Sequence, residues 1–338
     1  MRRACQNIMV SVIIPMYNNE DTIGYAIESV LNQDYDNYEI LVIDDGSTDN
    51  SIDAATKALL GCTKCCVLFH ENGRNKGVSA TRNVGIKSAS GELLAFLDAD
   101  DLWESNKLSA CVEPFMQYPS IVMVYHSAKV FTVDNATMKA HGVYGSGRAG
   151  YRKVSYPDIY KNSFVAPTSS VVIKRQVLDK CGLFYENWKY GEDGLLWYSV
   201  LQHGDVYYYE KVLSKYRIHE NQWNAIANEE LKVYRRVKFY IHFASICDIR
   251  VQSATVRCIT AHGARIVLRW ALSSDCNPLA HMIKLYKLVL SAGYRKVYLS
   301  ISLFRVVMEE LIIHYGRRVI GLFWEKKSIE DMRSRRRV

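Results

Sequence analysis

Three carboxylates stand within four positions at Asp98-Ala99-Asp100-Asp101. They directly follow the apolar run Leu93–Leu97, which is typical of a buried strand. Neighbouring carboxylates raise one another's pKa and resist ionising together unless a cation offsets them. Mg²⁺ or Mn²⁺, held by a few carboxylates and by substrate phosphates, meets that need. A strand-end turn leading into a helix N-cap is the alternative, because Asp is a good capping residue.

Alternating strand and helix patterns must position this acidic segment. Such alternation predicts an α/β fold with a mostly parallel central sheet flanked by helices. Ligands of these sheets bind at the carboxyl ends of the strands. We expect strands at Val10–Pro15, Glu39–Ile43, Val67–Phe69 and Leu93–Leu97, and helices at Glu20–Asn32, from Asn50 through Ala55, and at Gly77–Ser88.

Three loops are therefore expected at one edge of the sheet. They carry Tyr17-Asn18, Asp44-Asp45 and Asp98-Ala99-Asp100. An aromatic side chain, paired acids and a metal-type acidic loop together indicate a nucleotide-diphosphate site. The chain has neither Gly-x-Gly-x-x-Gly after the first strand nor Gly-x-x-x-x-Gly-Lys-Ser/Thr, which argues against dinucleotide oxidoreductases and P-loop NTPases.

Five segments occur in the order of a known family. They are Ser11–Asn18, Val42–Asp49, Asn75–Asn83, Phe96–Asp101 and Gly191–Trp197. Together they resemble the motifs of the family 2 glycosyltransferases with the GT-A fold, and Tyr216–His219 resembles the end of that family's catalytic domain. The likeness covers about residues 8–222. It implies transfer of a sugar from a nucleotide-diphosphate donor, most often a UDP-sugar, to an acceptor hydroxyl, usually with inversion at the anomeric carbon.

The resemblance also assigns residues to the nucleotide. Asp45 would accept the hydrogen bond of the uracil imide, with Asp44 as the alternative, although Asp44–Ser47 also predicts a turn and a helix cap. Lys76 and Arg82 would meet phosphate or pair with the acidic loop, and for Arg82 we favour a structural ion pair. The full set of implied nucleotide-binding residues is Pro15, Tyr17, Asn18, Asp44, Asp45, Lys76, Asp98 and Ala99.

The resemblance further implies a divalent cofactor. Asp100 would coordinate Mn²⁺ or Mg²⁺, and Asp98 would contact the ribose or support the metal. His219 would be the second protein ligand, the alternative being a surface or packing histidine. The departing nucleotide diphosphate carries charge that a bridging cation stabilises as a Lewis acid. Asp101 is expected to cap the helix that follows.

Asp193 is the implied general base, because an incoming hydroxyl is a poor nucleophile until a carboxylate removes its proton. Glu192 would point elsewhere within a helix, since adjacent positions do not share a face. The alternative is that the two acids merely open a helix, where the helix dipole favours them.

Segment Asp134–Gly150 bears several glycines and is expected to be a mobile loop near the acceptor. The acceptor-site candidates are Trp188, Tyr190, Glu192 and Thr168–Ser170.

Charge divides the chain in two. Residues 1–224 hold 22 Lys and Arg against 26 Asp and Glu, whereas residues 225–338 hold 21 against nine, which gives +8 in total. We expect a catalytic domain over residues 8–224, with a nucleotide-sugar half at about 8–105 and an acceptor half at about 106–224. The basic region 225–338 is predicted to be mainly helical. A broad apolar stripe flanked by arginines predicts peripheral attachment to an anionic membrane surface. Packing on the catalytic domain or on a second copy, as a homo-oligomer, is the alternative.

The nine cysteines show no disulfide-framework spacing. Cys62-x-x-Cys65-Cys66 is the one cluster, and it lacks the second ligand pair of a zinc site. We expect free structural or incidental cysteines and a reducing, cytoplasmic setting, on the inner face of the membrane. No apolar window is long enough for a spanning helix or a signal peptide.

A glycosyltransferase that extends a glycan or a lipid-linked saccharide is the favoured function. A sugar nucleotidyltransferase is the first alternative, but that class needs a Gly-rich basic loop directly after the first strand, where this chain has Pro15-Met16-Tyr17-Asn18. A non-catalytic nucleotide-sugar or membrane-binding module is the second, and Asp98, Asp100 and Asp193 speak against it. No nucleic-acid partner is expected, because the first part of the chain is acidic and no nucleic-acid motif precedes the Arg-rich end.

Overall fold

The computed structural model describes residues 8–134, 137–144, 150–152, 166–188 and 191–219. These residues all belong to the first of the two units into which the chain divides, Met1–Ile226 and Ala227–Val338. The predicted basic C-terminal region lies outside the described residues, so its helices and its membrane contact stay predictions. None of the helices in the described ranges is long and apolar enough to cross a membrane.

The first part of the chain builds the parallel half of the sheet. The strands lie in the order β3-β2-β1-β4, and all three pairings are parallel. The expected elements are all present, although β3 begins two residues earlier than predicted and α1 three residues later. The elements are β1 (Val10–Met16), α1 (Ile23–Leu31), β2 (Tyr38–Asp44), α2 (Ser51–Ala58), β3 (Cys65–Phe69), α3 (Val78–Ser88) and β4 (Leu93–Phe96).

The second part extends the same sheet with mixed pairing. The order continues as β4-β9-β6-β10-β5, where β9 is antiparallel to both of its neighbours and β10 runs parallel to β6. The predicted α/β fold is confirmed, and the sheet is mixed beyond β4. These elements are β5 (Leu102–Trp103), α4 (Lys107–Gln117), β6 (Ile121–Asp134), β7 (Thr137–Tyr144), β8 (Gly150–Arg152), the 3-10 turn η2 (Thr168–Ser170), β9 (Val172–Lys174), η3 (Arg175–Val177), α6 (Leu178–Cys181), α7 (Glu192–Val200) and β10 (Asp205–Arg217).

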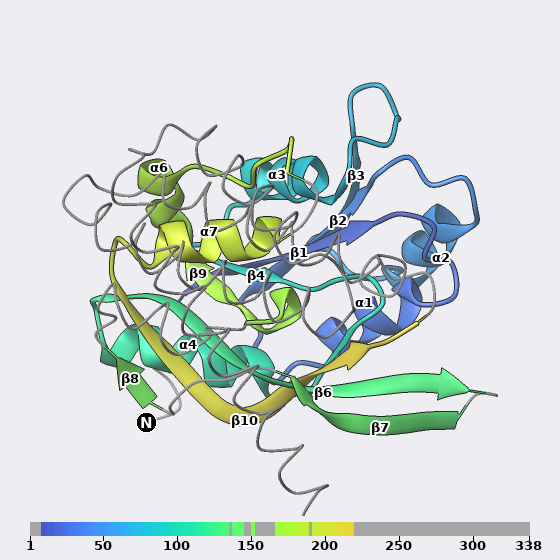
Figure 1. Ribbon diagram of the computed structural model, residues 1–338. Coiled ribbons are helices and arrows are strands. Elements are labelled where there is room, and N and C mark those ends of the chain that lie inside the picture. The colour runs from blue at the N-terminus through green and yellow to red at the C-terminus, as the bar shows by residue number, and fades with distance from the viewer. Residues whose placement is uncertain (1–7, 135–136, 145–149, 153–165, 189–190, 220–338) are drawn as a thin grey trace, which may run out of the picture. The chain divides into compact units, whose positions relative to one another are not determined.

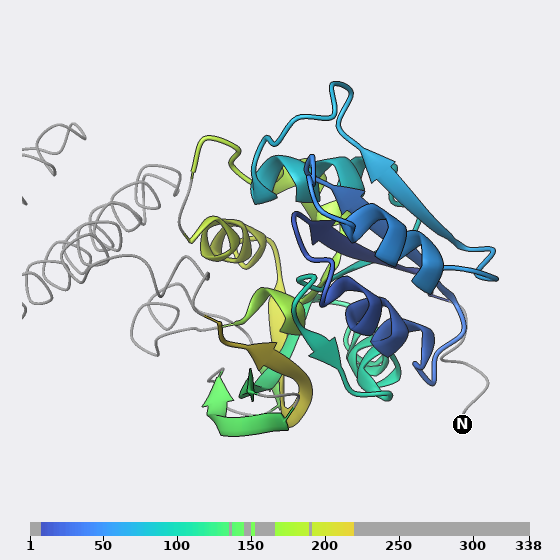
Figure 2. The same ribbon diagram turned by 90° about the vertical axis from the view of Figure 1, so that its right-hand side faces the viewer.

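Helices cover both faces of this sheet. Figures 1 and 2 show α1, α2 and α4 on one face and α3, α6 and α7 on the other. Because successive side chains of a strand point to opposite faces, alternate residues of β1 reach the first layer. Val12 and Ile14 of β1 are fully buried there, in one core cluster with Ile27 of α1 and Leu108 of α4.

On the opposite face, α3 lies close to the strands. A Cβ on Gly85 would stand 2.7 Å from Cγ2 of Ile13 and 2.7 Å from Cδ1 of Ile43. Both isoleucines are fully buried, so neither has room to move. A larger residue at Gly85 would push α3 away from the sheet, and with it Arg82, which the same helix carries.

Two expectations about irregular segments are wrong. The segment Asp134–Gly150, expected to be a mobile loop, contains β7, which pairs antiparallel with β6 over 137–144. Cys62 and Cys65, expected to be free, form a disulfide. The turn after α2 brings their Cα atoms to 5.6 Å, which is within the range that a disulfide spans. Cys66 is a free cysteine.

Candidate active site

The loops that follow β1 and β2 are tied together. The backbone N–H of Asn18 donates to Oγ of Ser47 at 3.0 Å, and the Asn18 side-chain oxygen accepts from the backbone N–H of Thr48 at 2.9 Å. Asn18 has a φ of 51°, in the left-handed region that Asn tolerates. Gly46 has a φ of 78°, and a Cβ there would lie 2.9 Å from the backbone nitrogen of Asn75. The loop before α3 therefore packs directly on this pair of loops.

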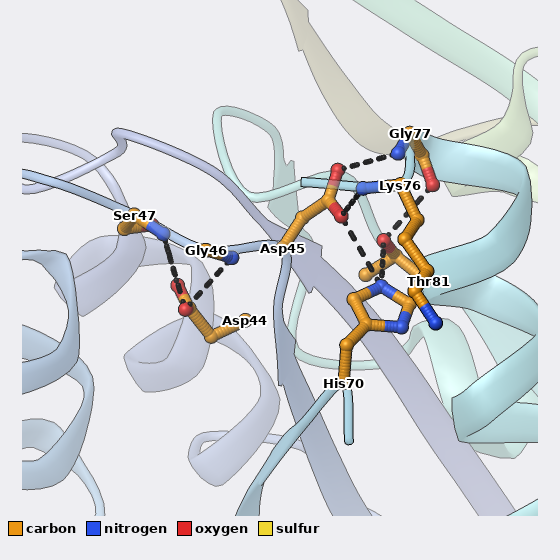
Figure 3. A network of polar contacts seen from close by, with 8 residues as sticks. All are labelled: Asp44, Asp45, Gly46, Ser47, His70, Lys76, Gly77 and Thr81. Carbon is orange, nitrogen blue, oxygen red and sulfur yellow. Dashed lines mark hydrogen bonds and ion pairs between the residues drawn. The ribbon is translucent and has the colours of Figure 1, made fainter. Parts of the chain in front are cut away.

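The adjacent acids Asp44 and Asp45 point in different directions (Figure 3). Asp44 accepts hydrogen bonds from the backbone N–H groups two and three residues further on, at 3.0 and 3.1 Å, so the predicted turn is present. Asp45 reaches across to the start of α3, where it accepts from the backbone N–H groups of Lys76 at 2.7 Å and Gly77 at 3.0 Å.

A buried histidine completes this network. Nε2 of His70 lies 3.1 Å from Oδ1 of Asp45 and 3.1 Å from Oγ1 of Thr81. The Thr81 hydroxyl donates its proton to the carbonyl of Gly77, so we assign the proton between Thr81 and His70 to Nε2. Asp45 thus holds the loop before α3 in place. Which of Asp44 and Asp45 contacts a base stays a prediction. In each carboxylate one oxygen, Oδ1 of Asp44 and Oδ2 of Asp45, has a single donor among the described residues and keeps a further lone pair.

Arg82 links the acidic loop to helix α7. Its guanidinium lies 2.7 Å from Oδ1 of Asp98 and 3.0 Å from Oε1 of Glu192, and it lies over the ring of Phe184 at 5.2 Å. Burial alone would lower the pKa of Arg82, but the carboxylates of Asp98 and Glu192 outweigh burial and raise it. The favoured role of Arg82 as an ion-pair partner is confirmed.

The negative charge of the acids around Arg82 exceeds the single positive charge of its guanidinium. Burial raises the pKa of Asp98, with Arg82 opposing the rise and Asp100 adding to it. Burial also raises the pKa of Glu192, where Asp193 adds and Arg82 opposes. One guanidinium thus faces several carboxylates, and such a cluster favours a further cation.

Asp100 meets a histidine from the far end of the domain. Oδ2 of Asp100 lies 3.0 Å from Nε2 of His219, and the two side chains are 19% and 40% exposed. Nε of Arg217 donates to the Asp100 carbonyl at 2.8 Å and fixes the backbone there. In the part of the chain that the structure describes, no three His, Cys, Asp or Glu side chains gather at a possible metal site.

Asp101 does not cap a helix, so that expectation is wrong. It is 1% exposed and accepts hydrogen bonds from Oγ of Ser169 at 2.6 Å and from the backbone N–H of Arg217 at 2.8 Å. The chain after Asp101 enters β5, and the next helix begins at Lys107 with Asn106 as its N-cap. Burial raises the pKa of Asp101 well above its ordinary value, and the neighbouring carboxylates add to this.

Asp193 lies in the first turn of α7. Its Oδ2 accepts from Oγ1 of Thr168 at 3.0 Å, and its Oδ1 accepts from the backbone N–H of Gly194 at 2.7 Å. Glu192, the residue before it, is turned towards Arg82 instead. The two acids therefore have different partners, as expected for adjacent positions of a helix.

The remaining acceptor candidates differ in their accessibility. The side chain of Glu192 is 15% exposed, and Trp188 is partly buried. Thr168–Ser170 form the buried turn η2. Tyr190 lies outside the described residues.

The remaining nucleotide candidates are divided between the interior and the surface. Pro15 and Ala99 are buried, whereas Tyr17 and Lys76 have exposed side chains. Tyr17 directly follows β1 and is 45% exposed, so its ring is accessible to a planar base. The binding roles of all four stay predictions.

The sequence of this chain matches the family model described as "Glycosyl transferase family 2" over residues 11–182. The match spans the loops after β1, β2 and β4. The chain belongs to glycosyl transferase family 2. The family that its motifs resemble is thus confirmed.

Curated relatives of this family 2 chain carry glycosyltransferase names. An uncharacterized glycosyltransferase of Rickettsia felis is 36% identical over 219 residues, which is 64% of this chain and 34% of that protein. This chain thus matches only about a third of that relative's length. WfaP of Escherichia coli, named as a UDP-Glc:alpha-D-GlcNAc-diphosphoundecaprenol beta-1,3-glucosyltransferase, is 31% identical over 71% of this chain and 90% of its own length.

Solved structures share the fold at low sequence identity. TarS of Staphylococcus aureus, residues 1–349 in complex with UDP-GlcNAc, has a TM-score of 0.60 at 19% identity, over 84% of this chain and 79% of TarS. The mannosyltransferase PcManGT of Pyrobaculum calidifontis, in complex with GDP-Man and Mn²⁺, has a TM-score of 0.54 at 15% identity, over 90% and 87% of the two chains. These likenesses confirm the predicted GT-A fold of this family 2 chain.

Sequence reasoning missed one residue of this site, His70, and the contact that a second residue, Thr168, makes with Asp193. His70 had no motif around it, and only the approach of β3 to the loop after β2 brings it to Asp45. Thr168 was considered for the acceptor, but its contact with Asp193 joins positions 25 residues apart. The small polar cluster Thr168–Ser170 was the one available signal for the second residue.

Proposed function

We propose that this protein transfers a sugar from a UDP-sugar to a hydroxyl of a lipid-linked glycan, with inversion at the anomeric carbon. Asp193 is the general base, and Asp100 and His219 hold Mn²⁺ or Mg²⁺. The observation that carries the proposal is a contact between the proposed donor site, at the acidic loop, and the proposed base, on α7. Arg82 contacts Asp98 of the acidic loop and Glu192, the neighbour of Asp193.

The proposed metal ligands fit a divalent cation. Asp100 Oδ2 and His219 Nε2 are 3.0 Å apart and partly exposed. Two ligands that each lie about 2.1 Å from one octahedral cation have this separation. Mg²⁺ and Mn²⁺ are commonly bound by few protein groups and by substrate phosphates. When bound, such an ion stabilises the charge of the departing nucleotide diphosphate.

Asp193 suits the role of base by its own hydrogen bonds. Thr168 and Gly194 each occupy one lone pair of its carboxylate. No other hydrogen bond to Asp193 comes from the described residues, so lone pairs remain for an incoming hydroxyl. The acceptor proton would pass to Asp193 as the acceptor oxygen bonds to the anomeric carbon. A direct displacement of this kind inverts that carbon.

The identity of the donor and acceptor rests on relatives. WfaP is named for UDP-Glc and for an acceptor linked to diphosphoundecaprenol, and TarS was solved with UDP-GlcNAc. We extend only the classes to this protein, namely a UDP-sugar and a lipid-diphosphate saccharide. The first half of the site supports the donor class through Tyr17, exposed beside the loop that Asp45 holds.

The proposal is tested on the full-length protein in two steps. A thermal-shift screen compares UDP-, GDP- and dTDP-sugars with and without Mn²⁺, because a ligand of the native state raises stability by RT ln(1 + [L]/Kd). Transfer is then measured to a synthetic lipid-diphosphate N-acetylglucosamine, and NMR gives the anomeric configuration of the product. We expect a shift with a UDP-sugar and Mn²⁺, and an inverted product. No shift with any donor, or a product of retained configuration, overturns the proposal.

The sugar nucleotidyltransferase alternative makes a different prediction. Such an enzyme would form the nucleotide sugar from a nucleoside triphosphate and a sugar phosphate and release pyrophosphate. Pro15-Met16-Tyr17-Asn18 stands where that class needs a Gly-rich basic loop. We expect no pyrophosphate release from UTP and any sugar 1-phosphate.

Membrane contact through residues 225–338 is part of the proposal. This region holds 21 Lys and Arg against nine Asp and Glu, and an anionic surface attracts each nearby cation by roughly 1 kcal/mol. Sedimentation with vesicles tests it. We expect binding to vesicles that contain anionic lipid and release by salt. Equal binding to neutral vesicles would contradict the electrostatic part, and a concentration-dependent dimer without vesicle binding would favour the oligomer alternative.

A further inference from the structure

The 3-10 turn η2 lies between the acidic loop and helix α7. Its three residues are at most 7% exposed. The first of them, Thr168, donates from Oγ1 to Oδ2 of Asp193 at 3.0 Å. The backbone N–H of Gly194 holds the other oxygen, Oδ1, at 2.7 Å. Among the described residues, each oxygen of the Asp193 carboxylate thus has one donor, and Thr168 is the one that lies outside α7.

The next residue of the same turn is fastened to the acidic loop. Oγ of Ser169 donates to Oδ2 of Asp101 at 2.6 Å and accepts from the backbone N–H of Asp98 at 3.0 Å. The carbonyl of Ser169 accepts from Nε1 of Trp103 at 2.8 Å. Because a single planar peptide joins Thr168 to Ser169, the turn leaves little freedom between Asp193 and the acidic loop.

We propose that Thr168 is a positioning residue that aims the Asp193 carboxylate at the acceptor hydroxyl. The hydroxyls of Thr168 and Ser169, which are consecutive residues of one buried turn, fix the position of Asp193 relative to the acidic loop. Without the Thr168 hydroxyl, Asp193 keeps only its local bond to Gly194, and rotation about its χ1 carries Oδ2 away from the set direction. This inference rests on the proposed role of Asp193 as the base.

Paired variants of Thr168 separate an effect on the direction of the Asp193 carboxylate from an effect on the stability of the fold. Thr168→Val removes the hydroxyl and keeps the shape, whereas Thr168→Ser keeps the hydroxyl. For Thr168→Val we expect kcat to fall by about 10- to 100-fold, as for a catalytic group displaced by about 1 Å, with KM for the donor changed less than about twofold. Thr168→Ser should restore kcat to within about threefold of the parent. A donor KM that rises with an unchanged kcat overturns the inference.

Ser199→Ala is the matched control. The Ser199 hydroxyl is buried like that of Thr168 and lies in the helix that carries Asp193, but it donates to the carbonyl of Leu195 in the same helix. We expect kcat within about twofold of the parent, even where its melting temperature falls as far as that of Thr168→Val. An equal loss of kcat in the control would show that Thr168→Val acts only through stability, and would overturn the inference.

A double-mutant cycle distinguishes this inference from the function on which it rests. In an Asp193→Asn background, Thr168→Val should cause no further loss of kcat, because the group that it aims is already inactive. A further loss of tenfold overturns the positioning role. If Asp193→Asn alone keeps full turnover, the proposed base fails instead. If Asp193→Asn loses turnover but Thr168→Val keeps the kcat of the parent, the proposed base stands and the positioning role fails.

Discussion

Oδ2 of Asp100 lies 3.0 Å from Nε2 of His219, although 119 positions separate the two residues in the sequence. Asp100 follows β4, and His219 follows β10, with β9 and β6 between those strands in the sheet. The contact is possible because the loop after β4 crosses the edge of the sheet to reach β5, which pairs with β10 at Ser214 and Lys215. The pairing of β5 with β10 thus brings the two proposed metal ligands together.

The Asp100–His219 contact predicts a metal affinity that depends on both side chains. Asp100→Asn and His219→Ala should each weaken Mn²⁺ binding in the presence of UDP by at least about tenfold. Electron paramagnetic resonance of free Mn²⁺ measures this without turnover. His203→Ala, at an exposed histidine, is the control and should bind Mn²⁺ as the parent does. Unchanged affinity in both test variants would remove this pair as the metal site.

The direction of Asp193 predicts a specific kinetic defect. Asp193→Asn keeps the size and the hydrogen bond from Thr168 but cannot take a proton, so kcat should fall by roughly 10²- to 10⁴-fold. The donor affinity from thermal shift should stay near that of the parent, because Asp193 removes a proton from the acceptor. Single-turnover assays with saturating acceptor measure the chemical step. Weak donor binding with a normal chemical step would assign Asp193 to the donor.

The buried position of Arg82 predicts a large cost for its removal. Arg82→Met leaves Asp98 and Glu192 without their shared cation, and breaking a buried pair costs about 3–5 kcal/mol. Because Asp98 is partly exposed, we expect the lower end of that range in urea unfolding. Arg175→Met is the control, since Arg175 is exposed and its guanidinium donates to a backbone carbonyl, that of Ala89, rather than to a carboxylate. It should cost less than about 1 kcal/mol. Equal costs for both would refute the role of Arg82 as a buried link.

Lys107 predicts a pH-dependent stability. Its side chain is fully buried with Nζ 3.4 Å from the centre of the Trp103 ring, and no described residue hydrogen-bonds to that nitrogen. Burial lowers the pKa of Lys107 to about 7, whereas an unfolded lysine has a pKa of about 10.4. Between these values the unfolded state binds more protons, so this group makes stability rise with pH from about 7 to 10.

Lys107→Met tests this relation. The variant should be more stable than the parent by about 1–3 kcal/mol at pH 7, and its advantage should shrink as the pH rises to 9.5. Urea unfolding at several pH values above 7 measures it. The neighbouring His126 and Cys111 interfere little there, because burial lowers the pKa of His126 to about 3 and raises that of Cys111 to about 11. Lys129→Met, at an exposed lysine, should show no such trend. A stabilisation independent of pH would show that the cost of Lys107 is not a protonation cost.

Much of the fold was predictable because the sheet elements are encoded locally. The apolar runs at Val10–Pro15 and Leu93–Leu97 are short and continuous, as strands buried on both faces must be. The ordering of motifs placed Tyr17, Asp45 and Asp100 at one edge, which follows from parallel strands alone. The disulfide between Cys62 and Cys65 and the strand β7 were not predictable in this way. The disulfide depends on where the turn after α2 directs the chain, and β7 depends on its pairing with β6.

The family and the candidate site residues could be predicted from the sequence, because the order of the five motifs and the carboxylates at strand ends do not depend on packing. The sequence alone determined the family and the α/β class, and it predicted the residues that would meet a nucleotide and a cation. Only the tertiary structure decided which hydrogen-bond partners each of these acids has. Asp101, predicted as a helix cap, is buried and accepts hydrogen bonds from Ser169 and Arg217, and Asp44 and Asp45 point in different directions (Figure 3). The physical reason is that a carboxylate's role is set by its donors, and those donors come from segments far away in the chain.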